Sequence, residues 1–212
     1  MRERAVSLFR RHFGRPPESL VRAPGRINLI GGHTDYNDGY VLPLAIDRAA
    51  WVAAAPIDLR RGRIAALDLD QETEFSIAPV PPSRGDWGDY PRGVAWSLGT
   101  AGYRLGGIEA ILTSEVPVGA GLSSSAAVEV AFAWTWRTLS DLDLHRTEAA
   151  QLCQRAENEY VGLRCGVMDQ MASAWGQADH ALLLDCRTLE VTPVPLPSSA
   201  AIVVADTNVR RE

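Results

Sequence analysis

A glycine- and serine-rich segment between a β-like run and a helix-forming run constrains this chain most. Residues 117–127 read Pro-Val-Gly-Ala-Gly-Leu-Ser-Ser-Ser-Ala-Ala and join the run 111–116 to the run 126–139. The glycines let the backbone approach a ligand closely, and the serines offer capping oxygens and hydroxyl donors. Because unpaired N–H groups and the positive end of the helix dipole converge there, the segment predicts a phosphate site. Taken alone, it could also be an ordinary turn that caps a helix.

Composition excludes several familiar phosphate-binding enzymes. All 21 basic residues other than histidine are arginine. A Walker A lysine and the strand lysine of protein kinases are therefore both absent. The dinucleotide-binding fingerprint also fails, because Ser124 replaces its third glycine and Asp141 and Asp143 follow a helix-forming run instead of a second strand.

A second segment, residues 22–39, places many polar side chains after a strand. The strand-like start breaks at Gly31 and Gly32, and residues 33–38 then offer His, Thr, Asp, Tyr, Asn and Asp side chains. Turn chemistry accounts for residues 37–39 but does not require the polar cluster before them. Such a density of donors and acceptors suits a polyhydroxylated ligand.

A third segment, residues 156–171, joins two helical stretches near residues 162–166. Asp169 lies near the start of the second stretch, with Val167, Met168 and Met171 close in sequence. Apolar neighbours would desolvate this acid and favour a role as proton acceptor. The alternative is that Asp169 is a plain helix-start acid and Glu157 a solvated helix acid.

Together the three segments resemble the GHMP family of sugar and metabolite kinases, and within it the galactokinases. The resemblance rests on residues 24–31 (PGRINLIG), 33–37 (HTDYN), 117–127 and 165–170 (CGVMDQ), and it extends from about Arg22 to the last residue. It implies an α+β fold, a GHMP-type N-terminal domain with a mixed sheet and packed helices. It also implies ATP-dependent, Mg²⁺-assisted phosphorylation of a monosaccharide, galactose to galactose 1-phosphate.

The resemblance also implies roles for individual residues. Asp169 would orient or deprotonate the C1 hydroxyl of the sugar, and Arg26 would stabilise charge on the transferring phosphoryl group. The sugar-contacting positions are His33, Asp35, Gly166 and Asp169. The triphosphate positions are Gly119, Ala120, Gly121, Leu122, Ser123, Ser124 and Ser125, and Ser125 and Glu157 would hold Mg²⁺. Trp87 resembles a tryptophan that packs on adenine. The alternative is that Trp87 is an aromatic residue of a lid or of the core.

Two departures from the family pattern bear on function. Gly32 stands where galactokinases usually carry a glutamate that binds the distal hydroxyl of the sugar, so a sugar without the ordinary C6 hydroxymethyl group is an alternative substrate. The family also continues beyond residue 212 into a C-terminal domain. We therefore expect residues 1–180 to form the N-terminal domain and residues 181–212 to begin a truncated second one. The alternative to an active sugar kinase is a catalytically silent regulator that binds sugar and ATP, or an inactive gene fragment.

Further expectations follow from the last residues of the chain and from its amino-acid composition. The apolar run 202–205 is expected to be buried against a second domain. The 212-residue chain alone would leave this surface and one wall of the site uncovered, so we expect it to be inactive and to self-associate. No apolar run approaches ~18 residues and no signal peptide is visible, so the cytoplasm is the default location. The net charge of −5 argues against nucleic acid as a partner. Three scattered cysteines indicate packing instead of zinc or disulfides.

Periodicity predicts a leading helix, then mostly strands, then mostly helices, which favours α+β over a doubly wound sheet. The expected helices span residues 4–13, 91–103, 124–139, 146–161 and 167–175. The expected strands span residues 19–23, 26–29, 40–46, 49–55, 63–69, 108–114, 180–186, 190–194 and 200–205. The proline-rich stretch 78–85 predicts a surface loop.

Overall fold

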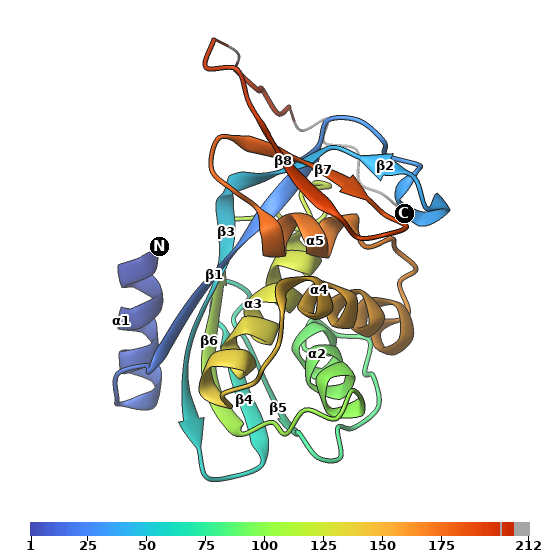
Figure 1. The fold of residues 1–212 in the computed structure, drawn as a ribbon. Coiled ribbons are helices and arrows are strands. Elements are labelled where there is room, and N and C mark those ends of the chain that lie inside the picture. The colour runs from blue at the N-terminus through green and yellow to red at the C-terminus, as the bar shows by residue number, and fades with distance from the viewer. Residues whose placement is uncertain (200, 206–212) are drawn as a thin grey trace.

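Helices cover both faces of a central five-stranded sheet, and a smaller sheet lies at one end of the molecule (Figure 1). The computed structural model describes residues 1–199 and 201–205. Its helices are α1 (Arg2–Phe13), α2 (Asp89–Thr100), α3 (Ser124–Leu139), α4 (Arg146–Arg155), the π-helical turn η2 (Ala156–Val161) and α5 (Met168–Trp175), with a short 3₁₀ turn, η1 (Asp35–Asn37). Its strands are β1 (Ser19–Asn28), β2 (Tyr40–Val41), β3 (Pro43–Ile57), β4 (Arg61–Ala66), β5 (Gln71–Ser76), β6 (Gly107–Ser114), β7 (His180–Asp185) and β8 (Val191–Pro195).

The central sheet is mixed, as predicted. Its strand order is β1-β3-β6-β4-β5, and only the β4–β6 pair is parallel. The long strand β3 lies between β1 and β6 and pairs with both over most of its length. Antiparallel neighbours joined by short turns, followed by helices, confirm the α+β class.

Alternation along β3 divides its side chains between two cores. Ala53 and Ala55 join Phe9 of α1 on one face of the sheet, whereas Val52 and Ala54 face the main core beneath the other helices. Successive strand residues point to opposite faces, so a run of small apolar residues can serve both layers. The small alanines also let helices approach the sheet closely.

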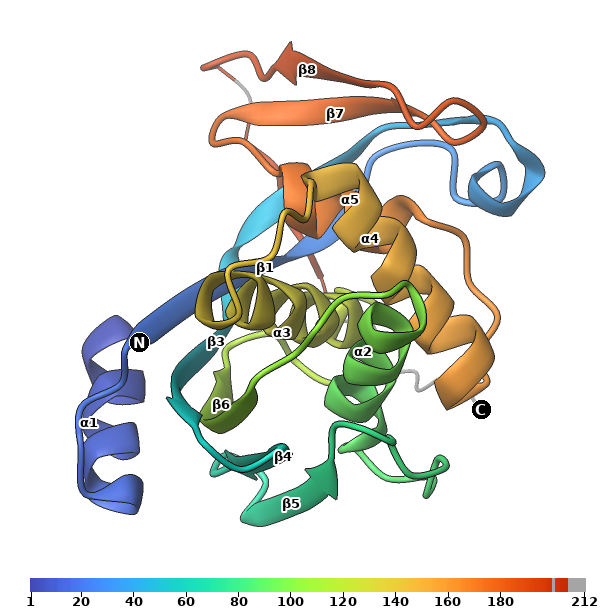
Figure 2. The same ribbon diagram turned by 60° about the horizontal axis from the view of Figure 1, so that its bottom comes forward.

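The second sheet has the order β2-β7-β8 and is antiparallel throughout. Figure 2 shows β7 and β8 above α5, away from the central sheet. Strand β7 pairs with β2 through Tyr40–Asp185 and Val41–Leu184. This sheet therefore ties residues 180–195 to the polar segment that follows β1.

Most predicted elements are confirmed, and the differences have local causes. The runs 19–23 and 26–29 form one strand with a bulge between Pro24 and Arg26. Strand β5 was missed because its sequence, QETEFS, is polar and buries only Phe75. The predicted helix 146–161 ends in the π-helical turn η2 instead of continuing as α-helix.

The predicted strand 200–205 is wrong for the residues that can be judged. Residues 201–205 are irregular, and Ile202, Val203 and Val204 are 43%, 87% and 54% exposed. Residue 200 lies outside the described residues. The proline-rich stretch 78–85 is irregular, as expected.

Two compositional expectations can be compared with the structure. Cys153 and Cys186 are buried free thiols and Cys165 is a partly buried one, so burial agrees with the expected packing role. In the part of the chain that is described, no helix has both the length and the apolar character needed to cross a bilayer.

Candidate active site

The bulge in β1 brings the strand against the glycine- and serine-rich loop. At Gly25 an added Cβ would lie 2.7 Å from the carbonyl oxygen of Leu122 and 3.0 Å from Val116 Cγ1, so only glycine fits without movement. The next residue, Arg26, donates its backbone N–H to the Leu122 carbonyl at 3.1 Å. The close approach places the Arg26 side chain beside the loop.

The loop itself turns through left-handed backbone conformations. Gly119, Gly121 and Ser123 have φ values of 75°, 73° and 57° before α3 begins at Ser124. Glycine adopts this region without strain, whereas serine does so at a cost, and such strain gathers at functional sites. Ser123 does not cap the helix with its side chain, contrary to the expectation for the serines.

The Ser123 hydroxyl instead donates to Oδ2 of Asp169, in the first turn of α5. Arg26 binds the same carboxylate in a bidentate manner, with Nε 2.7 Å from Oδ1 and Nη2 2.6 Å from Oδ2. Its Nη1 donates to the Gly121 carbonyl at 2.7 Å. Arg26, Asp169 and the loop thus form one hydrogen-bonded cluster.

The surroundings of Asp169 differ from the apolar pocket that the sequence suggested. Met168 and Met171 are buried in the core, whereas the Asp169 side chain is 24% exposed and paired with Arg26. Helical periodicity explains the difference, because residues adjacent in a helix point in different directions. The partner that fixes Asp169 comes from β1, which no local sequence pattern shows.

Asp35 and Gly166 are in direct contact. A Cβ at Gly166 would lie 2.1–2.3 Å from the Asp35 carboxyl atoms, so a larger residue there would displace the carboxylate. Asp35 Oδ1 accepts a hydrogen bond from the Met168 backbone N–H at 3.1 Å. Burial, together with the charge of Asp169, raises the pKa of Asp35, although the Met168 N–H works against this.

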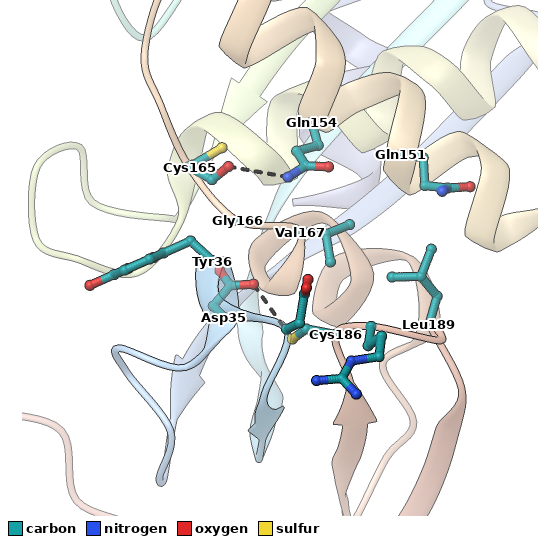
Figure 3. Close-up of a pocket in the computed structure, with 11 residues that line it drawn as sticks. Asp35, Tyr36, Gln151, Gln154, Cys165, Gly166, Val167, Cys186 and Leu189 are labelled. Atoms are coloured by element: carbon teal, nitrogen blue, oxygen red, sulfur yellow. Dashed lines mark hydrogen bonds between the residues drawn. The ribbon is translucent and has the colours of Figure 1, made fainter.

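Asp35 and Gly166 line a cavity of about 420 Å³ between η1, the start of α5 and the end of β7 (Figure 3). Cys186 and Gln154 lie on its other walls, and the Cys186 thiol approaches Asp35 Oδ1 at 3.6 Å. His33 does not line this cavity. Its Nδ1 lies 2.7 Å from the Tyr36 hydroxyl in an exposed turn.

A second, apolar cavity of about 360 Å³ adjoins the start of α3. Trp87, Tyr90, Ser124 and Ser125 line it together with aliphatic side chains from β4, β6 and the loop before α3. The structure thus brings Trp87 next to the serines of the loop. Tyr90, the second residue of α2, was not predicted. Burial raises its pKa to about 12.

A buried acidic cluster lies behind the loop. Gln170 Nε2 donates to Glu129 Oε2 at 3.0 Å and to Glu157 Oε2 at 2.7 Å. The Cys165 thiol also donates to Glu157 at 3.3 Å. Burial and the charge of Glu157 raise the pKa of Glu129 well above its usual range. Among the described residues, no hydrogen bond joins Glu157 to Ser125.

Sequence reasoning missed Glu129 and Gln170. Glu129 lies one turn after Ser125 on α3, where its neighbours Val130 and Ala131 are apolar, and it is fully buried. A charged residue on the buried face of a helix is a signal that periodicity could have provided. Oε1 of Glu129 and Oε1 of Gln170 are buried without hydrogen-bond partners among the described residues.

Comparison with known families agrees with this geometry. Residues 7–56 match the galactokinase galactose-binding signature, and residues 89–177 match the N-terminal domain of GHMP kinases. The two matches include β1, the polar turn, the loop before α3 and the start of α5. The chain therefore belongs to the GHMP kinase family.

Within this family the chain is similar to galactokinases. It is 53% identical over 203 residues to galactokinase of Roseiflexus sp. (strain RS-1), covering 96% of this chain and 52% of the relative. Galactokinase of Chloroflexus aggregans is 47% identical, with 95% and 52% covered. The chain thus spans about half the length of the curated relatives it matches.

Solved structures show the same similarity. Lactococcus lactis galactokinase complexed with galactose is 34% identical, with a TM-score of 0.83 over 90% of this chain and 50% of that one. Methanococcus jannaschii mevalonate kinase, 16% identical with a TM-score of 0.68 over 83% of this chain and 55% of that one, shows the shared fold alone.

Proposed function

We propose that the protein containing this chain transfers the terminal phosphoryl group of ATP to the C1 hydroxyl of galactose. The observation that carries the proposal is the Arg26–Asp169 pair, whose carboxylate also accepts from Ser123 of the loop. A charge-stabilising cation, a positioned carboxylate and a phosphate loop are the parts that phosphoryl transfer needs. The similarity to galactokinases at 53% identity supports galactose as the acceptor.

Asp169 and Arg26 have complementary roles in this proposal. Asp169 orients the C1 hydroxyl and accepts its proton as the new O–P bond forms, so no covalent intermediate is needed. A positioned base of this kind typically contributes ~10²- to 10⁴-fold. Arg26 offsets the negative charge on the transferring group while keeping Asp169 in place.

Asp35, Gly166 and His33 form the sugar side. Asp35 offers a partly buried carboxylate, and Gly166 leaves the space that this carboxylate needs. The Lactococcus lactis relative is a complex with galactose, which supports a galactose site here. At Gly32, an added Cβ would meet only Asn28 Nδ2, at 3.8 Å, so the departure from the usual glutamate leaves open space.

The loop and the apolar cavity form the nucleotide side. Residues 119–125 would cradle the triphosphate through backbone N–H groups at the start of α3. Trp87 and Tyr90 would hold the adenine ring, since flat aromatic side chains in an apolar cavity suit a flat base.

Ser125 and Glu157 would hold Mg²⁺. A hydroxyl and a carboxylate, completed by phosphate oxygens and water, fit this hard cation. The Gln170 amide donates to both Glu157 and Glu129, and Glu129 lies one turn after Ser125 on α3, which supports a cation site in this corner. When bound, the ion would neutralise charge on the phosphates.

The wider organisation is also a proposal. Residues 1–180 would carry the sugar and phosphate sites, and residues 181–212 would begin a second domain that closes the cleft. The partners are the sugar and ATP, and ATP use is our reason to propose the cytoplasm.

A chimaera tests the function directly. Joining this chain to the C-terminal half of the Roseiflexus relative should restore galactose- and ATP-dependent formation of galactose 1-phosphate. Preference for a sugar without the ordinary C6 hydroxymethyl group would shift the assignment toward the alternative substrate. A folded, monodisperse chimaera that binds both substrates without turnover would instead support the silent regulator.

A further inference from the structure

A third cavity, which is polar and has a volume of about 590 Å³, shares no lining residue with either candidate substrate cavity. Arg22 of β1, Arg137 of α3 and Arg146 of α4 all line it, with His145 beside them. Among the described residues no aspartate or glutamate lines it, and the Asp143 carboxylate lies 3.8 Å from His145. Three different elements, one strand and two helices, therefore place arginines around one hollow.

Each of the three guanidinium groups lies over a tryptophan ring. Their central carbons lie 6.0 Å from the Trp51 ring centroid for Arg22, 5.1 Å from Trp134 for Arg137, and 5.3 Å from Trp175 for Arg146. Stacking occupies the face of a guanidinium and leaves its in-plane N–H groups available. Each guanidinium group is thus held beside an aromatic ring and keeps N–H groups that can donate to a ligand.

Their hydrogen bonds leave their charge unneutralised. Arg137 Nε donates to the Leu144 carbonyl at 2.9 Å, and Arg22 Nη2 donates to the Asp47 carbonyl at 2.8 Å. Within residues 1–199 and 201–205, none of the three has an ion-pair partner, and both these acceptors are neutral. By contrast, Arg26 and Arg92 are each paired with carboxylates.

This local excess of positive charge is opposite to the charge of the chain as a whole, which is −5. Like charges that share a hollow repel one another, and a bound anion removes that repulsion. Planar guanidinium groups match the oxygens of phosphate in paired hydrogen bonds. A cavity of this size accommodates a small organic ligand.

We propose that this cavity binds a small phosphorylated molecule, a phosphate monoester or polyphosphate, at a site separate from the one that carries out phosphoryl transfer. The three arginines supply N–H donors to its phosphate oxygens. The proposal does not depend on the kinase function, because none of its residues belongs to the Arg26–Asp169 cluster.

Titration of the ¹⁵N-labelled chimaera with inorganic pyrophosphate tests it. Resonances of the Trp134 and Trp175 indole N–H groups, assigned through Trp134→Phe and Trp175→Phe, should shift in a saturable way that weakens with added salt. The triple variant Arg22→Gln, Arg137→Gln, Arg146→Gln should weaken binding by at least ~10-fold, as expected from losing charge-assisted hydrogen bonds. Shifts near Gly119–Ser123 report the other phosphate site and should persist.

Arg104→Gln is the matched control, since Arg104 is exposed and lines neither this cavity nor the substrate cavities. It removes one positive charge and should leave the indole shifts unchanged. Arg137→Lys keeps the charge but loses the planar fork, and should weaken binding less than Arg137→Gln. Indole resonances that do not respond to millimolar pyrophosphate, or that respond equally in the folded triple variant, would overturn the proposal.

Discussion

Arg26 and Asp169 lie 143 positions apart in the chain, yet they form a bidentate ion pair. The Nε–Oδ1 distance is 2.7 Å and the Nη2–Oδ2 distance is 2.6 Å. The bulge at Gly25 aims Arg26 at the loop, and the first turn of α5 presents Asp169 to it. The third nitrogen of Arg26 is bound to the Gly121 carbonyl. Contacts within the protein itself therefore hold the charged centre of the site in place, which lowers the reorganisation required during reaction.

Gly166→Ala should impair sugar binding specifically. Its methyl group would meet the Asp35 carboxylate at 2.1–2.3 Å and force that side chain away. In an active chimaera we expect KM for galactose to rise by roughly tenfold or more, as for a loss of ~1.4 kcal/mol, with KM for ATP nearly unchanged. Gly32→Ala is the control, because its methyl group has open space. Equal effects of the two substitutions on KM for galactose would contradict this account.

Asp35→Asn should separate stability from function. Since burial raises the pKa of Asp35, the folded state holds its proton more tightly than the unfolded state does. The wild type therefore loses stability as pH rises from about 4 through the raised pKa. The substituted amide keeps an acceptor for the Met168 N–H and carries no charge. Urea unfolding should show the variant at least as stable at pH 7, with the gap closing in acid, while galactose binding is lost.

A less stable variant at pH 7 would contradict the sign of this effect. It would mean that the Asp35 carboxylate is a net stabilising group in the folded chain.

Asp89→Asn should loosen the loop that carries Trp87. The Asp89 carboxylate accepts from Ser83, from the backbone N–H groups of Arg84 and Gly85, and from the buried Arg92. We expect loss of stability by ~1–3 kcal/mol at pH 7 and weaker nucleotide binding, measured by urea unfolding and by quenching of Trp87 fluorescence. Asp179→Asn, at an exposed position, should change neither.

The pH dependence of this effect has the opposite sign to that of Asp35. Burial alone would raise the pKa of Asp89, but the hydrogen bonds lower it below its usual range. Its contribution is therefore complete above about pH 4 and disappears as pH falls through the lowered value. A difference between wild type and Asp89→Asn that grows in acid would refute the role given to these hydrogen bonds.

Gln170→Leu should lower the free energy of unfolding, because it removes a hydrogen-bond donor from the buried acidic cluster. It removes the amide that donates to both Glu129 and Glu157, at a cost of ~1–3 kcal/mol for each buried acceptor left without its donor. Adding Glu129→Leu should recover part of the loss, because replacing both partners by apolar groups is close to neutral. If the double variant unfolds at lower urea than Gln170→Leu alone, Glu129 is not an uncompensated acid there.

Three candidate ligand segments could be picked out from the sequence because each combines a break in periodicity with chemistry that folding alone does not require. The roles of Asp35, Gly166 and Trp87 came instead from the resemblance to the GHMP kinases, and the structure places Asp35 against Gly166 and Trp87 beside Ser124. The helix α3 was predicted to the residue, since serines mark its start and small apolar residues fill it.

What could not be predicted depends on contacts across the fold. The pairing of Arg26 with Asp169 needs β1 and α5 to meet, and the Gln170 bridge needs α3, η2 and α5 together. Strand β5 has almost no apolar pattern because it lies at the sheet edge. Local propensity carries no information on such long-range partners.

Turnover of Asp169→Asn in the chimaera tests the central claim most directly. The variant should bind galactose in calorimetry about as well as the wild type, because the amide fills the same space. Its rate of galactose 1-phosphate formation should fall by at least ~10²-fold, as for loss of a positioned base. Near-wild-type turnover in the folded variant would contradict the account, and would mean that the carboxylate held by Arg26 does not take part in phosphoryl transfer.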